Sequence, residues 1–152
     1  TNGIRPLPGI TKLIANGVKL TITVSFDGIG RVHEYVRWPS NWDHFQSTLR
    51  FYQELGNAIN LDTWTTVSAL NISDLKNIID YTGSRGIKHS WAFLEQPDVL
   101  NVKYSNHLTR TADVPEELRS QVATDRDNTV ELQLWTAKQD ALRGIRLGDY
   151  YK

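Results

Sequence analysis

The sequence predicts an α/β fold, either an incomplete (β/α) TIM-like barrel or an open parallel sheet of three to four strands with two C-terminal helices. Three strand-like segments lie at residues 18–26, 61–70 and 87–94, and helical patterns precede and separate them. Helix–strand alternation of this kind is typical of right-handed crossover units, which build parallel sheets. Three clear strands are too few for a closed barrel of eight, so both forms stay open.

The first strand-like segment has the clearest pattern. Five apolar residues alternate with polar ones through it: Val18, Leu20, Ile22, Val24 and Phe26. This period of two predicts a strand. Residues 61–70 are rich in Thr, Val and Trp, which favour strands, and residues 87–94 end at Glu95-Gln96-Pro97.

Helices are predicted before each strand. Ile10, Leu13 and Ile14 have helical spacing, and Gly17 follows where a left-handed C-terminal cap falls. Residues 40–58 form a second helix in which Ser40 is the expected N-cap. Its apolar stripe consists of Trp42, Phe45, Leu49 and Tyr52. The third helix has Ser73 as its expected N-cap and ends near Gly83, with an apolar face of Leu75, Ile78 and Ile79.

After residue 106 the pattern contains helices alone, so residues 112–152 are predicted to be a helical C-terminal extension. Asp113 is the expected cap of a helix that starts at Val114, and a later amphipathic helix ends at Gly144. The apolar stripe of that later helix consists of Val130, Leu134, Ala137 and Ala141. Because no linker or repeat interrupts the chain, residues 1–152 are predicted to form one partial-barrel domain.

Composition excludes several classes of protein. The 152 residues contain 17 Lys and Arg and 17 Asp and Glu, so the formal charge is zero. A neutral chain does not attract nucleic acid or an anionic membrane, and no apolar run reaches the roughly 20 residues of a membrane span. We therefore expect a cytoplasmic globular domain with a small-molecule ligand. The chain has no Cys, which excludes disulfides and thiolate metal sites on it. It also has no Met, so a processed chain or a fragment is expected.

Ligands of parallel sheets bind beyond the carboxyl ends of the strands, so the polar segments at residues 27–37, 70–73 and 94–98 are the candidates for a site. The first of them and the end of its strand contain Ser25, Asp27, His33, Glu34 and Arg37. A guanidinium can pair with a ligand carboxylate through two hydrogen bonds. The alternative is a polar surface loop in which Arg37 pairs with Glu34 or Asp27. The four His are scattered without metal-ligand spacing, so no metal site is predicted.

Four segments, in order, resemble the later part of radical S-adenosylmethionine enzymes of the twitch-domain type. They are Thr1-Asn2-Gly3; Ser25-Phe26-Asp27-Gly28 with Arg37 downstream; residues 67–75 with Asn71 in the turn; and Leu142-Arg143-Gly144-Ile145. The resemblance implies part of a (β/α) barrel and S-adenosylmethionine as the cofactor. It implies that Ser25 contacts the ribose or methionyl group and that Arg37 holds the carboxylate. Asp27 and Asn71 would line the same cavity, and Phe93 or Leu94 would contact adenine.

In that family a Cys-x-x-x-Cys-x-x-Cys loop holds a [4Fe–4S] cluster, and this chain has no Cys. The resemblance therefore implies a cluster only in a parent enzyme, and a fragment that is inactive alone. Its exposed sheet edges predict self-association. The alternative is a non-catalytic nucleotide- or ligand-binding domain derived from that fold. A third hypothesis, a hydrolase or aldolase on the same barrel, requires Lys19 or Lys88 to point into the cavity in its lysine-dependent form.

Overall fold

The computed structural model describes residues 1–105, 119 and 127–150. Its sheet consists of β1 (Leu20–Ser25), β2 (Ile59–Val67) and β3 (Lys88–Phe93), all parallel and in the order β1-β2-β3. The predicted open parallel sheet of three strands is confirmed. β2 begins two residues before the start of the predicted range and ends three residues before its end. It ends early because Ser68 leaves the ladder and enters a turn stabilised by Asn71.

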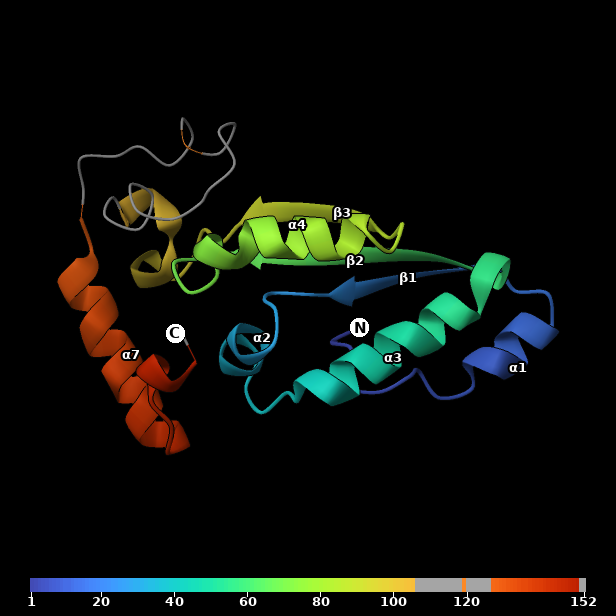
Figure 1. Cartoon of the computed structure of the whole chain (residues 1–152), viewed down its shortest axis with the longest axis horizontal. Coiled ribbons are helices and arrows are strands. Elements are labelled where there is room, and N and C mark those ends of the chain that lie inside the picture. The colour runs from blue at the N-terminus through green and yellow to red at the C-terminus, as the bar shows by residue number, and fades with distance from the viewer. Residues whose placement is uncertain (106–118, 120–126, 151–152) are drawn as a thin grey trace.

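In the described part of the chain, the helices are α1 (Ile10–Ala15), α2 (Arg31–Val36), α3 (Trp42–Glu54), α4 (Leu75–Gly83) and α7 (Thr129–Arg143), and Figure 1 shows α1 and α7 beyond opposite ends of the sheet. Short 3-10 turns lie at Gly56–Ala58, Ile72–Asp74, Asp98–Leu100, Val102–Tyr104 and Leu147–Asp149. None of the described helices is long and apolar enough to cross a membrane.

One face of the sheet carries the main core. β1 and β2 are neighbours joined through α3, and β2 and β3 through α4, so two right-handed crossovers place both helices on the same face. The largest cluster joins strand residues to α3 and α4, and its members include Ile22, Val24, Phe45, Leu49, Tyr52, Ile59 and Ile78. The predicted stripe of α3 is confirmed, with Trp42 half-buried and the other three residues buried.

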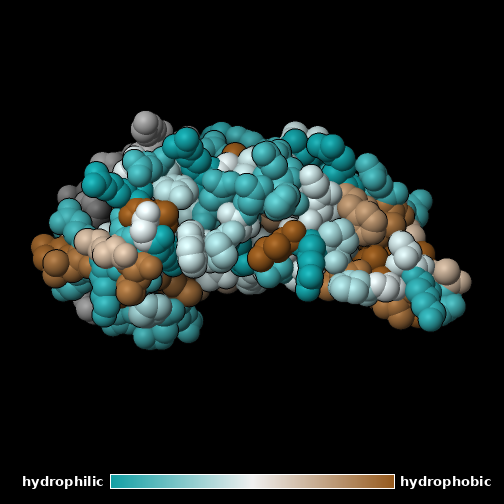
Figure 2. Space-filling view, turned by 90° about the horizontal axis from the view of Figure 1, so that it is seen from below, coloured by the Kyte–Doolittle hydropathy of each residue, from teal (hydrophilic) through white to brown (hydrophobic). Residues whose placement is uncertain are grey.

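The opposite face of the sheet is open among the described residues. Its outward residues are mainly polar, and Trp64 at its centre is 39% exposed. Trp64 is in register with Ser25 on β1 and Ser90 on β3. The molecule has an arched outline in Figure 2. No described strand pairs with the outer edge of β3, and self-association through that edge stays a prediction.

Both predicted N-caps of the crossover helices are shifted by one residue. The side chain of Asn41, not Ser40, accepts the His44 amide at 3.0 Å and caps α3. The N-cap position of α4 is Asp74 rather than Ser73, and a 3-10 turn precedes it. The cap of α3 differs because Ser40 Oγ is instead 3.1 Å from the buried ring of His33.

α7 lies beyond the carboxyl ends of the strands (Figure 1), and its buried side is not the predicted stripe. Val130 and Leu134 are 65% and 68% exposed, while Leu132 and Thr136 are buried. The predicted stripe is wrong because Thr136 donates its hydroxyl to Leu132 O at 2.9 Å, which lets a polar residue face the core. The helix ends at Gly144, as predicted, and this glycine adopts the left-handed conformation. The helix predicted from Val114 lies outside the described residues.

The first residues lie along the free edge of β1. The Thr1 amino group donates to Thr23 O at 2.7 Å, and Ser25 N donates to Thr1 O at 2.8 Å. A single residue makes this pair of bonds in a parallel ladder. Gly3 then turns the chain at φ +72°, and a Cβ there would lie 2.7 Å from the Phe45 ring. Thr1 therefore extends the sheet, and the absence of a side chain at Gly3 lets α3 approach.

Candidate functional site

The segment after β1 is a helix rather than the expected polar loop. Gly30, at φ +56°, precedes α2, and His33 and Tyr35 on this helix are fully buried. A Cβ on Gly28 would lie 2.7 Å from His33 N, so the turn closes tightly onto the helix. The loop expectation is wrong because six residues are too few to show a helical period. The alternative in which residues 27–37 form a polar surface loop is therefore wrong, although its pairing of Arg37 with Asp27 is correct.

Asp27 and Arg37 form an ion pair at the carboxyl end of β1. Arg37 Nε donates to Asp27 Oδ2 at 2.8 Å, and Thr66 N donates to Oδ1 at 2.9 Å. Asp27 is 6% exposed, and burial raises the pKa of its carboxyl group although Arg37 and the Thr66 amide act in the opposite direction. No hydrogen bond joins the terminal nitrogens of Arg37 to another described residue, so they remain open to a ligand.

Asn71 holds the ends of β1 and β2 together. Its amide donates to Asp27 O at 3.0 Å and to Thr66 O at 3.1 Å. Its carbonyl oxygen accepts the Ser68 amide at 2.7 Å and the Ser68 hydroxyl at 3.3 Å. With both donors used and the side chain buried, Asn71 positions the Asp27 backbone.

A pocket of about 470 Å³ opens beside this ion pair. Its wall combines polar side chains with apolar ones: Asn2, Asp27, Arg37 and Ser40, and Ile4, Val36, Trp38 and Pro39. Trp38 is 46% exposed, so its indole ring is accessible from the surface. The sequence reasoning placed Asp27 and Arg37 together here but missed Ser40, Trp38 and Asn2 as wall residues. Asn2 belongs to a segment quoted for the resemblance, which was the only available signal.

Four of the six predicted site residues are not among those that line this pocket: Asn71, Ser25, Phe93 and Leu94. Ser25 is half-buried at the end of β1, next to Trp64 on the open face. Phe93 packs with Val67 and Leu75 under α4, and Leu94 packs with the cluster beneath α7. Phe93 and Leu94 are thus engaged in protein packing, and their predicted contact with a cofactor stays a prediction.

The C-terminal residues hold α2 in place. The Tyr35 hydroxyl donates to Asp140 Oδ1 at 2.8 Å, and Asp140 Oδ2 accepts the Leu147 amide at 2.6 Å. Arg143 Nη1 donates to Tyr35 O at 3.0 Å. Burial and the Asp140 carboxylate raise the pKa of Tyr35, so its hydroxyl stays protonated. Arg37 directly follows α2, so these contacts help to fix the backbone from which its side chain extends.

Replacing Tyr35 with Phe is expected to lower the free energy of unfolding by about 1 kcal/mol, because one hydrogen bond is lost while the ring still packs. Urea unfolding monitored by tryptophan fluorescence measures this change. The matched control is Tyr81→Phe on α4, outside this cluster, where the one described contact of the hydroxyl is a long one of 3.5 Å with Gln46 Nε2. A Tyr35→Phe loss no larger than that of the control contradicts a specific role for the bond to Asp140.

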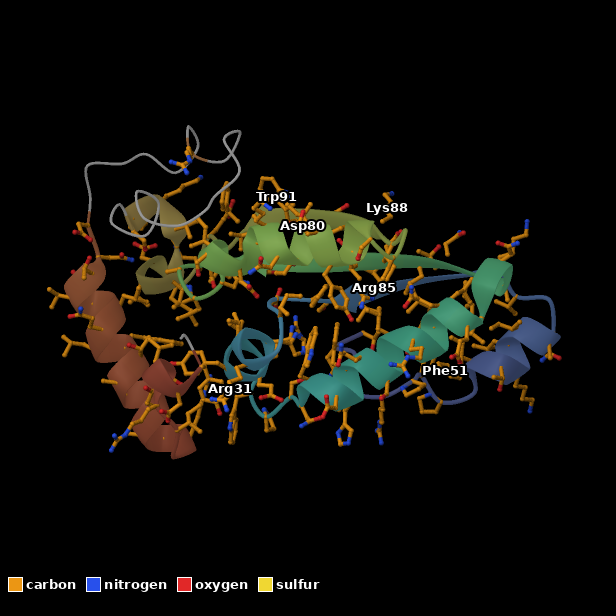
Figure 3. All side chains as sticks on the ribbon, viewed as in Figure 1. Arg31, Phe51, Asp80, Arg85, Lys88 and Trp91 are labelled. Carbon is orange, nitrogen blue, oxygen red and sulfur yellow. The ribbon has the colours of Figure 1, made fainter. Side chains whose placement is uncertain are left out.

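The two lysines that a lysine-dependent hydrolase or aldolase would require do not line this pocket. Lys88 begins β3 and Lys19 directly precedes β1, so both lie at the amino-terminal ends of the strands (Figure 3 labels Lys88). No group of three or more His, Cys, Asp or Glu that could hold a metal ion occurs among the described residues. His89 is half-buried on β3, where its Nδ1 lies 3.0 Å from the Thr63 hydroxyl.

Comparisons of the chain with protein families, curated proteins and solved structures find no match.

Proposed function

We propose that the pocket beside Asp27 and Arg37 binds a small amphipathic ligand through the carboxylate of the ligand, and that this ligand is S-adenosylmethionine. The observation that carries the proposal is the orientation of Arg37. Arg37 Nε donates to Asp27 Oδ2 at 2.8 Å, and no described residue bonds to the terminal nitrogens of Arg37. Arg37 also lines a pocket of about 470 Å³. A guanidinium fixed on one side and open on the other is suited to a carboxylate.

The rest of the wall supports a ligand with a charged end and a ring system. Trp38, Pro39 and Ile4 present apolar surface on which a nucleoside can pack, while Ser40 and Asn2 offer polar groups near Arg37. A volume of about 470 Å³ lies within the range of small-molecule sites. The resemblance to radical S-adenosylmethionine enzymes points to the same ligand, and in that interpretation the sheet is part of a partial barrel.

The residues of this chain do not fit an iron–sulfur cluster. Cluster ligands are thiolates, and the 152 residues contain no Cys. We therefore derive no reaction through a cluster, and the proposed function of this chain is binding. It agrees with the non-catalytic ligand-binding alternative as well as with a fragment that retains part of a cofactor pocket.

Calorimetry with S-adenosylmethionine and its decarboxylated form tests the proposal on the full chain. We expect the decarboxylated ligand to bind at least tenfold more weakly, because a charge-assisted hydrogen bond contributes about 1.5–3 kcal/mol. Changing the ligand instead of the protein leaves the Asp27–Arg37 pair intact, so the result does not depend on the stability of a variant.

An Arg37→Lys variant should weaken binding of S-adenosylmethionine because an ammonium cannot bond Asp27 and the carboxylate in the same geometry. The matched control is Arg31→Lys at the start of α2, because Arg31 lies outside the pocket and its Nη1 donates to Asp149 O at 2.7 Å (Figure 3). Equal affinity for both ligands, or equal losses in both variants, contradicts the proposal.

A further inference from the structure

His33 is the most unusual polar side chain of the site, because it is fully buried and only half hydrogen-bonded. Its ring lies 4.3 Å from Phe45, 5.6 Å from Trp42 and 6.1 Å from Phe26 between ring centroids. Its Nε2 is 3.1 Å from Ser40 Oγ. Its Nδ1 is buried and has no hydrogen-bond partner among the described residues. Such an orphaned atom requires an explanation.

The ring carries one proton at neutral pH. Burial, together with the positive charge of Arg37, lowers the pKa of His33 to about 3. A neutral imidazole has one donor nitrogen and one acceptor nitrogen. Two tautomers are therefore possible, and they orient the Ser40 hydroxyl in opposite ways.

If Nδ1 carries the proton, Ser40 donates to Nε2, and a buried N–H is left without an acceptor. If Nε2 carries the proton, it donates to Ser40 Oγ, and only an acceptor lone pair is left unpaired at Nδ1. Orphaned buried N–H groups are rarer than under-satisfied acceptors. The surroundings of Nδ1 therefore favour the tautomer that is protonated at Nε2.

This tautomer determines what Ser40 offers to the pocket. The Ser40 oxygen accepts from His33, so its own proton is free to point elsewhere. Ser40 lines the same wall as Arg37, and its backbone amide donates to Arg37 O at 2.8 Å, which keeps the two residues together. Both side chains then present hydrogen-bond donors to the pocket.

We propose that His33 is a positioning residue that holds Ser40 as a hydrogen-bond donor, so that Ser40 and Arg37 together bind one anionic group of the ligand. This inference rests on the proposed function for the identity of the ligand. It adds that the pocket selects an oxyanion, with a carboxylate as the simplest case, over an ammonium or a neutral amide at this position.

The tautomer is tested first on the free protein, without any ligand. In two-bond ¹H–¹⁵N spectra of the ¹⁵N-histidine-labelled chain at pH 7, we expect the proton-bearing nitrogen of His33 to couple to both ring carbon-bound protons, as Nε2 does. The signal is assigned by its loss in His33→Gln. A proton on Nδ1, or a charged ring, overturns the inference.

Variants test the link to the ligand. A Ser40→Ala change is expected to weaken the binding of S-adenosylmethionine about tenfold and to leave the binding of the decarboxylated ligand unchanged. His33→Phe should act like Ser40→Ala, whereas His33→Gln, whose amide can donate from a similar position, should restore binding. If the role of His33 is purely structural, His33→Phe and His33→Gln should both bind the two ligands more weakly and to the same extent. That result would overturn the inference.

Acetate separates this inference from the proposed function. If the wild-type chain binds no S-adenosylmethionine, the proposed function fails, and an acetate titration then decides the inference. We expect acetate to shift the amide signals of residues 37 and 40 in the wild type and to shift them much less in Ser40→Ala at the same acetate concentration. Equal shifts in both proteins, or none in the wild type, overturn the inference even where the tautomer is as expected.

Discussion

Replacing Arg37 with Ala is expected to lower the free energy of unfolding by about 2–3 kcal/mol at neutral pH. Asp27 is 6% exposed, and after this change the backbone amide of Thr66 is the one described group that still donates to its carboxylate. Removing one partner of a buried ion pair costs about 3–5 kcal/mol. We expect a loss slightly below this range because the Arg37 side chain is 24% exposed, so water can reach the carboxylate through the pocket.

The sign of the pH dependence follows from Asp27. Burial raises the pKa of this carboxyl group, so the folded protein retains its proton to higher pH than the unfolded chain does. Its ionisation therefore costs stability as the pH rises, and Arg37 limits that cost. In Arg37→Ala the cost is larger at neutral pH and disappears when acid protonates Asp27.

Urea unfolding at pH 7 and pH 4 measures both effects. We expect the deficit of Arg37→Ala to shrink at pH 4, and Asp27→Asn combined with Arg37→Ala to be no less stable than Asp27→Asn alone. The control is Arg31→Ala, whose exposed hydrogen bond to Asp149 O contributes less than 1 kcal/mol. A deficit that is the same at both pH values would show that the buried charge of Asp27 is not its cause.

Acid is expected to destabilise the protein through His33. The pKa of this ring is about 3 in the folded protein and near its ordinary value of 6.5 in the unfolded chain. Below pH 6.5 the unfolded chain binds a proton that the folded protein excludes, so stability falls with the pH until about pH 3. Each pH unit in this window costs up to about 1.4 kcal/mol, so the cost at pH 4.5 is roughly 3 kcal/mol.

The difference in unfolding free energy between the wild type and His33→Gln isolates this effect. Burial also lowers the pKa of His89. The contributions of His89 and of the carboxylates to the pH dependence of stability are equal in both proteins, so they cancel in this difference. We expect the difference to shift by roughly 3 kcal/mol against the wild type between pH 7 and pH 4.5. His44→Gln, at an exposed position of α3, is the control and should show no such shift. A difference that is independent of pH would contradict the buried, neutral state of His33.

Strong local patterns made the secondary structure predictable. Alternation over residues 18–26 indicates β1, and the spacing of Phe45, Leu49 and Tyr52 indicates the buried side of α3. Long repeated patterns succeed because strands and helices bury one face with a fixed period. The order of these elements also predicts parallel strands, because crossovers that contain a helix join strands in this way.

Short or polar segments were not predictable in the same way. α2 has six residues, two of which are buried polar or amphipathic side chains, His33 and Tyr35, so it resembled a loop. α7 buries Thr136 and leaves Leu134 exposed, because a backbone carbonyl accepts the hydroxyl of Thr136. Hydropathy assigns the opposite faces when a local hydrogen bond makes a polar residue acceptable in the core.

For the site, the residue pattern was enough to predict that polar residues follow β1 and that Asp27 and Arg37 are candidates for one pocket. Three features of the site became visible only in the folded chain: the terminal nitrogens of Arg37 have no described hydrogen-bond partner, the Asn71 side chain bonds to backbone groups, and Ser40 lines the pocket while its hydroxyl contacts His33. The physical reason is that hydrogen-bond partners of buried polar groups come from segments far apart in the chain. Residue type limits what each group can donate or accept, and packing selects its partner.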